Sequence, residues 1–248
     1  MTATAFDDLN DYLALPRVSC LAVSADGSRV VTTVAELNDE RTDYISAIWE
    51  VDPRGAQPGR RLTLGAKDES SPTFTSDGDL LFISSRSTSD DDERPASLWR
   101  LPASGGEAAE VLSMPGGIST VRTACTAETT VVGSRLLPAA RNVDDDRRLR
   151  KLRRDNKVTA ILHAGYPVRY WDEDLGPDEP HLFEANGPRD LTPQPGNALR
   201  EALRKTWFDV SADGRFVVTT WRVPGPGPAQ RSLLVRIDLD SGEHRVIA

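Results

Sequence analysis

Residues 77–112 read DGDLLFISSRSTSDDDERPASLWRLPASGGEAAEVL, and they align without a gap on residues 213–248, DGRFVVTTWRVPGPGPAQRSLLVRIDLDSGEHRVIA. Three features keep the same offset of 136 residues: an Asp-Gly pair (77 to 213), the middle of an apolar run (99 to 235) and a Gly-Glu pair (106 to 242). A further copy lies upstream, because Asp26 precedes Asp77 by 51 residues and Trp49 precedes Trp99 by 50. Such a period indicates a chain built from copies of one small structural unit.

Each copy has the pattern of four short β-strands. It opens with a short alternating run, turns at Ser-Ala-Asp-Gly or Thr-Ser-Asp-Gly, and continues in an apolar strand such as LLFIS from Leu80 or RFVVTTW from Arg215. Asp-Gly supplies the positive φ of a tight hairpin at low cost. The runs rich in Val, Ile and Leu are typical of sheets buried on both faces. We therefore predict an all-β fold, a β-propeller of four-stranded antiparallel blades.

After a short N-terminal helical segment at residues 1–16, four blades are predicted, at about 17–65, 70–113, 119–193 and 205–248. The third blade lacks the Asp-Gly turn, and its last two strands are joined by Asn186-Gly187. It carries an insertion at 137–165. The charged composition of this insertion and its acidic start predict a helix.

The insertion contains a basic cluster formed by Arg147, Arg148, Arg150, Lys151, Arg153 and Arg154. The cluster could hold phosphates, but the aspartates at 144–146 balance its charge and suit a helix start. With Leu149 and Leu152 on one face, a solvated helix that packs lightly on the propeller is favoured over a nucleic-acid site. The spacing of Asn142, Asp144 and Asp146 resembles a calcium loop, but Arg147 stands where the sharp turn needs glycine, so we expect no metal there.

Composition limits the other possibilities. The chain has 248 residues and a net charge of −8, which argues against general affinity for nucleic acid or for anionic membranes. Cys20 and Cys125 have no metal or disulfide spacing, and we expect both to be buried strand residues. No segment is apolar enough to span a bilayer, and the N-terminus lacks an export pattern, so a cytoplasmic location is expected.

Several segments together resemble one known family. They are DLNDYLALPRVSCLAVSADG near the N-terminus, SSPTFTSDGDLLFISSR in the second copy, and above all YPVRYWDEDLGPDEPHLFEANGPRDLTP from Tyr166. The whole chain resembles the N-terminal propeller of the prolyl oligopeptidase family (S9) of serine peptidases, nearest to its acylaminoacyl-peptidase and dipeptidyl-aminopeptidase group. In that family a propeller, usually seven-bladed, caps a C-terminal α/β-hydrolase domain and restricts entry to peptides. The resemblance implies that four blades are an incomplete ring.

The sequence departs from the family by ending without a hydrolase domain. A nucleophile elbow needs Gly-x-Ser-x-Gly, and the nearest stretch, Gly117 to Val121, lacks the second glycine. His163, His181 and His244 lie in contexts that give no acyl-transfer triad. We therefore predict no catalytic residue, cofactor or metal in this chain, and leave open whether it acts as an enzyme. The predicted role is to gate and orient peptide substrates for a hydrolase half that the chain lacks.

Two alternatives remain. One is a stand-alone propeller that acts as a protein-interaction module. The other is a closed four-bladed enzyme, which is disfavoured because no set of potential ligand-binding residues recurs in the loops at the ends of the blades. An incomplete ring would expose blade faces, so self-association through them is expected.

Candidate substrate contacts are few. In the resembling family, acidic propeller residues sometimes hold the free amino end of a substrate. The candidates for that role are Asp90, Asp91, Asp92 and Glu93, for which a solvated loop is the simpler interpretation. Tyr170 and Trp171 could line a peptide path, although we favour Trp171 as an anchor of its strand to the insertion and Asp172 as a turn cap. Trp49 and Trp99, equivalent by repeat, are expected to pack between blades.

Overall fold

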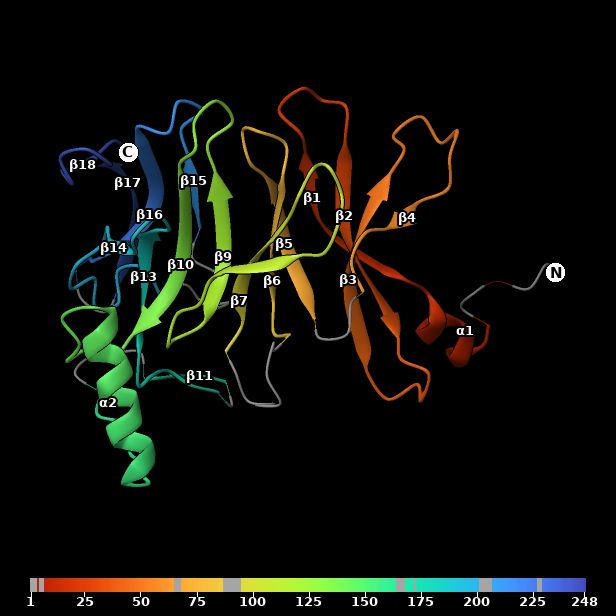
Figure 1. The fold of residues 1–248 in the computed structure, drawn as a ribbon. Helices are drawn as coiled ribbons and strands as arrows, with labels where there is room; N and C mark the ends of the chain where they lie inside the picture. The colour runs from red at the N-terminus through yellow and green to blue at the C-terminus, as the bar shows by residue number, and fades with distance from the viewer. Residues whose placement is uncertain are drawn as a thin grey trace. The chain divides into compact units, whose positions relative to one another are not determined.

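The computed structural model describes Thr4 and residues 7–64, 68–86, 95–163, 168–171, 173–200, 207–226 and 229–248, with the side chains of Tyr170 and Glu173 outside this description. The chain forms two compact units, Met1–Val111 and Leu112–Ala248. Four four-stranded antiparallel sheets and two α-helices dominate the described residues (Figure 1). The predicted all-β blade architecture is confirmed. No helix in these ranges is long and apolar enough to cross a membrane.

The first unit holds helix α1 (Leu9–Ala14) and two sheets. Asp8 caps α1, because its side chain accepts a hydrogen bond from the Asn10 amide. The strands of the first sheet are β1 (Arg17–Val23), β2 (Val30–Leu37), β3 (Tyr44–Val51) and β4 (Arg60–Arg61). Those of the second are β5 (Glu69–Phe74), β6 (Leu80–Ser84), β7 (Ser97–Leu101) and β8 (Ala109–Leu112), whose last residue is the first of the second unit. The core between them is formed by Val31, Ile48, Phe74, Leu80, Phe82 and Trp99.

The second unit repeats this arrangement and adds the insertion. Its first sheet consists of β9 (Ile118–Thr123), β10 (Thr130–Leu136), β13 (Glu179–Glu184) and β14 (Arg189–Asp190). Its second consists of β15 (Phe208–Val210), β16 (Phe216–Pro224), β17 (Gln230–Asp238) and β18 (His244–Val246). The insertion between β10 and β13 forms α2 (Val143–Asp155) and a small hairpin, β11 (Arg169–Tyr170) and β12 (Glu173–Asp174). Val131, Leu182, Leu191, Leu199, Phe208, Val217, Val235, Ile237 and Leu239 form the core.

The Asp-Gly pairs form the predicted hairpins. Gly27, Gly78 and Gly214 have φ angles of 71°, 87° and 69°, in the left-handed region that side chains rarely adopt. The Gly78 turn is one residue shorter than the others, because the Thr75 amide bonds the Asp79 carbonyl whereas the Ser211 amide reaches Phe216.

This difference corrects the gapless alignment of the second and fourth sheets. Phe82 pairs with Trp99, and Thr219 pairs with Val235. The second strands therefore correspond at an offset of 137 residues, while the third strands keep the offset of 136. Trp99 and Val235 nevertheless occupy equivalent places, since both are buried in the core of their unit.

The expectation for the two cysteines is wrong, because both are exposed. Cys20 lies in β1 with a φ of 53°, at the point where the pairing of β1 with β2 shifts register. β1 is an edge strand, and among its described residues only Ala22 packs against the core. Cys125 follows β9 in a bend, beyond the paired part of the strand.

Candidate functional site

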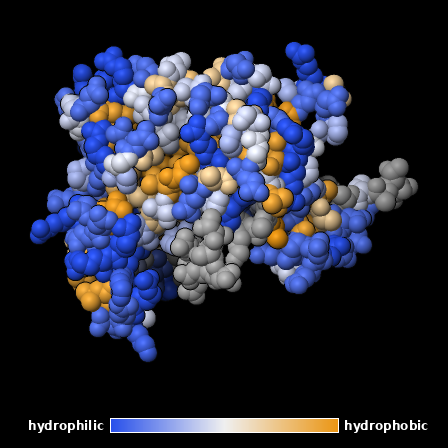
Figure 2. Space-filling view, viewed as in Figure 1, coloured by the Kyte–Doolittle hydropathy of each residue, from blue (hydrophilic) through white to orange (hydrophobic). Residues whose placement is uncertain are grey.

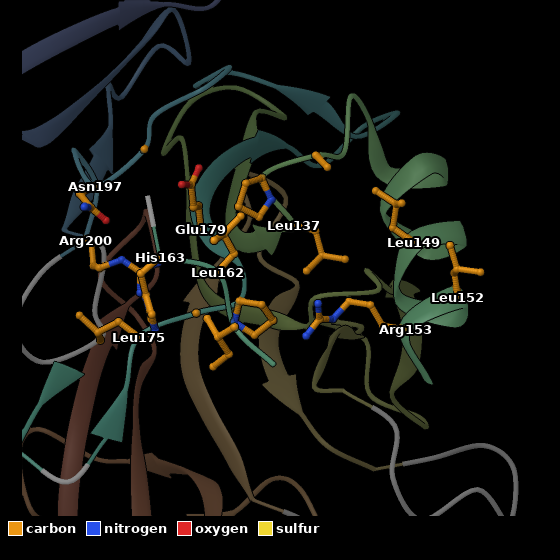
Figure 3. A pocket seen from close by; sticks show the side chains of 16 residues that line it. Leu137, Leu149, Leu152, Arg153, Leu162, His163, Leu175, Glu179, Asn197 and Arg200 are labelled. Carbon is orange, nitrogen blue, oxygen red and sulfur yellow. The ribbon is translucent and has the colours of Figure 1, made fainter. Parts of the chain in front are cut away.

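The second unit contains a cavity of about 540 Å³ between α2 and the sheet that carries the insertion (Figure 3). Its walls come from the segment after β10, from α2, from the segments before and at the start of β13, and from the segment before β15. The lining residues are mostly apolar: Leu137, Pro138, Ala139, Leu149, Leu152, Ile161, Leu162, Leu175, Gly176, Pro177 and Gly196, with the polar Arg153, His163, Glu179, Asn197 and Arg200. A volume of this size suits a small molecule or a short chain segment.

Helix α2 supplies one wall of the cavity. Asn142 caps it by accepting a hydrogen bond from the Asp145 amide at 2.9 Å, and three aspartates occupy its first turn, where the helix dipole favours them. Leu149 and Leu152 lie one turn apart on the face toward the cavity. Arg153 then donates from Nη2 to the Ala160 carbonyl at 2.8 Å, which holds the chain after the helix close to it.

A buried carboxylate fixes α2 to the sheet. Asp146 is fully buried, and its two oxygens accept hydrogen bonds from the Leu137 amide and from Arg150 Nε, each at 2.8 Å. Arg150 Nη2 also bonds Asp178 at 2.8 Å, and Arg135 Nε bonds the other Asp178 oxygen at 2.6 Å. Asp146 is the buried residue of α2, so the helix packs lightly on the sheet, as expected, and this network is what attaches it.

The electrostatics of this network favour the charged form of Arg150. Burial opposes the charge of Arg150, but the hydrogen bonds that it donates to Asp146 and Asp178 outweigh burial and raise the pKa of the guanidinium. The rest of the basic cluster is also largely paired on α2 itself, in the ion pairs Arg147–Asp144, Arg148–Asp145 and Lys151–Asp155. This pairing supports the interpretation of the exposed cluster as a solvated helix face.

Inside the cavity, basic side chains outnumber acidic ones. Arg153, His163 and Arg200 face one carboxylate, Glu179. Arg200 is only 8 % exposed and donates from Nη2 to the Asp178 carbonyl at 2.7 Å. The excess of basic over acidic side chains makes the cavity suited to binding an anionic or polar group.

The candidates chosen from the sequence are only partly covered by the described residues. Asp90, Asp91, Asp92 and Glu93 are outside the described residues, as is Asp172, so their roles remain predictions. The backbone of Tyr170 lies in β11. Trp171 is 98 % exposed at the turn after β11 with a φ of 54°, so its interpretation as an anchor is wrong. A two-residue hairpin is too short to bury an indole.

The histidines take separate places. His181 is buried in β13 with Nδ1 3.0 Å from Asp190 Oδ2, and His244 Nε2 lies 2.8 Å from the Leu191 carbonyl. His163 lines the cavity. Ser119 lies in β9 and not at a strand-to-helix turn. Among the described residues, no group of three or more His, Cys, Asp or Glu side chains is placed to hold a metal ion.

The cavity was not predicted from the sequence, although one apolar face of its wall was. The spacing of Leu149 and Leu152 marked an apolar face of α2, and Ile161 with Leu162 forms a second apolar pair after the helix. Two apolar pairs in an otherwise charged insertion are the signal that could have indicated a shared pocket. No sequence pattern indicates that Arg200 lines the cavity, because this residue is remote in sequence from α2.

Comparison with known proteins gives a fold and a partial sequence match. No known family model matches the chain. A region of 113 residues, 44% of the chain, is 31% identical to the uncharacterized peptidase YuxL of Bacillus subtilis (strain 168), of which it covers 16%. The structure is similar to an acylaminoacyl peptidase of Pyrococcus horikoshii (TM-score 0.60, 13% identity, 96% of this chain) and to the tricorn protease (TM-score 0.53, 12% identity, 93% of this chain).

The shares covered in those proteins are small: the chain spans 33% of the acylaminoacyl peptidase and 22% of the tricorn protease. At identities this low the structural similarity shows the fold alone. The predicted resemblance to the propeller region of acylaminoacyl peptidases is confirmed at that level.

Proposed function

We propose that this chain is the non-catalytic propeller part of a serine peptidase of the prolyl oligopeptidase family, and that it gates and orients peptides for a hydrolase domain. The observation that carries the proposal is the 31% identity with the peptidase YuxL over 113 residues, combined with a fold that follows an acylaminoacyl peptidase along 96% of the chain. A cytoplasmic location is part of the proposal, and cell fractionation tests it.

The physical basis of gating is the rigidity of the sheets. In each unit two sheets pack face to face through fully buried side chains such as Val31 and Phe82 or Val217 and Leu182. Close-packed sheets of this kind resist opening. A wall of such sheets would admit an extended peptide and exclude a folded protein, while all acyl-transfer chemistry would belong to the hydrolase domain.

The test is to extend the reading frame. The DNA that follows the codon for Ala248 should encode a Gly-x-Ser-x-Gly elbow, in frame or behind a frameshift scar. The protein from the repaired, extended frame should react with a fluorophosphonate probe and hydrolyse acyl-peptide chromogenic substrates, and the 248-residue chain should do neither. Stoichiometric labelling of a serine in the 248-residue chain, or flanking DNA without such an elbow, contradicts the proposal.

A stand-alone interaction module is the second candidate. It is favoured by the exposed apolar side chains of β1, Val18, Leu21 and Val23, which are 69%, 71% and 52% exposed. Binding of a partner protein by the 248-residue chain, with no hydrolase encoded nearby, would favour the module over the peptidase portion.

A further inference from the structure

We propose that the cavity beneath α2 is a binding site for a small ligand with an apolar chain that ends in a carboxylate. The shared chemistry covers a fatty acid and the C-terminal residues of an apolar peptide. This inference concerns a site within the second unit and does not depend on the proposed peptidase role.

The apolar part of the ligand is inferred from the walls. Leucine, isoleucine, alanine and proline side chains dominate the lining, and about 540 Å³ lies within the range of roughly 300 to 1,000 Å³ found for small-molecule sites. Leu152 and Leu162 line the cavity although they are 53% and 92% exposed. Figure 2 shows apolar side chains (orange) among charged ones (blue) over α2. A ligand that covers these leucines removes apolar surface from water, which is favourable.

The carboxylate is inferred from the charges. Figure 3 shows the Arg153 side chain extending from α2 toward the middle of the cavity, with Arg200 and His163 on the other side in this view. A guanidinium carries five N–H donors in a fork that matches a carboxylate. Arg153 donates from Nη2 to the Val158 and Ala160 carbonyls, which fixes the side chain in this direction. Apolar walls lower the local dielectric and strengthen the attraction for an anion.

A single negative charge fits better than a polyanion. Glu179 is part of the lining and only half-buried, so a phosphate-rich ligand would meet a like charge in the cavity. On α2 outside the cavity, Arg147 and Arg148 already pair with Asp144 and Asp145, which weakens the attraction of that surface for phosphates. The ligand therefore combines one carboxylate with an apolar body.

The test is isothermal titration of the full chain with defined probes: decanoate, octanoate, decyltrimethylammonium, and the peptide N-acetyl-Ala-Leu-Leu as the free acid and as the C-terminal amide. Decanoate should bind, octanoate about 15-fold more weakly because two fewer methylenes are buried, and the cationic analogue not measurably. Tighter binding of the peptide acid than of decanoate, lost on amidation, identifies a peptide C-terminus; the reverse order identifies a fatty acid.

Variants connect binding to the cavity. Arg153→Met should weaken decanoate about tenfold, because charge-assisted hydrogen bonds are lost; its control is Arg154→Met, the next residue, which is outside the lining. Ala139→Trp should abolish binding by filling the cavity without removing a charge, and Ala56→Trp, an exposed position in the first unit, should not. Three results would each overturn the proposal. They are equal binding of decanoate and the cationic analogue, failure of every anionic probe to bind, and unchanged affinity in both cavity variants.

Discussion

Single aspartates in the Asp-Gly turns hold their backbone loops through hydrogen bonds that depend on the charge of the carboxylate. Asp26 accepts bonds from Ser24 Oγ at 2.6 Å, Ser28 Oγ at 2.8 Å and the Ser28 amide at 3.0 Å. The Ser24 hydroxyl contributes most, and together these bonds lower the pKa of Asp26 to about 2. Hydrogen bonding by Ser211 and the Arg215 amide lowers the pKa of Asp213 in the same way.

The first prediction is a pH dependence of stability. Because the pKa of Asp26 is lower in the folded chain than its ordinary value of 3.8, its contribution is complete above about pH 4 and is lost as the pH falls toward 2. Asp26→Asn keeps a turn-forming residue but removes the charge, so its midpoint of thermal unfolding should fall less steeply than that of the wild type between pH 4 and pH 2. Circular dichroism melts measure this. Asp39→Asn, at an exposed loop position, is the control, and identical slopes for Asp26→Asn and wild type contradict the account.

At the scale of elements, the insertion depends on one buried side chain. Asp146 joins α2 to the Leu137 amide and, through Arg150 and Asp178, to Arg135 of β10. By contrast, the ion pair Asp144–Arg147 is exposed and joins two residues of α2 to each other, one helical turn apart. The cavity wall is therefore attached to the sheet by the hydrogen bonds and ion pairs of Asp146 and Arg150.

The second prediction tests this difference. Asp146→Ala leaves Arg150 partly buried without one partner and should lower the free energy of unfolding by about 3 kcal/mol. The Leu137 amide should also exchange its hydrogen faster, because it loses its acceptor. Asp144→Ala should change stability by less than about 0.5 kcal/mol, as is usual for exposed pairs. Urea unfolding and hydrogen exchange give both readouts, and equal effects of the two variants would show that the network is not needed.

In two sheets, a threonine just after the short fourth strand extends the hydrogen bonding to the third strand. The Ile48 amide donates to Thr63 Oγ1 at 2.9 Å, and the Leu182 amide donates to Thr192 Oγ1 at 3.0 Å. The repeat thus preserves a side-chain hydrogen bond at a point where β4 and β14 are only two residues long.

The third prediction follows from the complete burial of Thr192. Thr192→Val keeps the shape but leaves the buried Leu182 amide without an acceptor, which should cost about 1 to 2 kcal/mol of unfolding free energy. Thr192→Ser restores the hydroxyl and should recover most of that loss. Urea unfolding measures both variants. If the valine variant is as stable as the serine variant, the hydrogen bond to Leu182 does not stabilise the end of the sheet.

Strands and turns were predictable from the sequence because their signals are local. Alternation and Asp-Gly pairs mark β5, β6 and the Gly78 turn within a few residues. The one-residue difference between the Gly78 and Gly214 turns was not predictable, since an Asp-Gly pair fits loops of either length. The cavity brings Leu149 near Leu175 and Arg200, which are remote in sequence, and the exposure of Cys20 depends on what packs on β1. Neither leaves a local pattern.

At the scale of the whole molecule, the repeat indicates a face that lacks its partner. Trp99 on β7 belongs to the buried core that also contains Val31 and Ile48 of the preceding sheet, and Val235 on β17 belongs to the core that its sheet shares with the preceding sheet of its own unit. Trp49 takes the equivalent place on β3, opposite Thr32 as Trp99 is opposite Phe82. Among the described residues of the first unit, the second sheet packs on the opposite face, the one that holds Val31 and Ile48.

The open face is apolar. Leu21 pairs with Thr32 and Val23 with Val30, so these side chains share the side of the sheet that holds Trp49. Trp49 Nε1 is buried and has no hydrogen-bond partner among the described residues. Apolar side chains also reach the surface beside the first sheet and α1, at the right of Figure 2. A face of this composition favours burial against another sheet.

The last prediction is that this face drives association, either with a second copy of the chain or with a further blade of the same protein. Leu21→Lys combined with Val23→Lys places two charges on the face and should convert associated chain into monomer and reduce binding of a hydrophobic dye, because charges oppose dry packing. Val111→Lys, at a comparably exposed valine outside the face, is the matched control and should leave association unchanged. Size-exclusion chromatography with light scattering measures the mass. A wild-type monomer that binds no dye and melts cooperatively would show that the face is already covered, and would favour a self-sufficient interaction module over a portion of a larger ring.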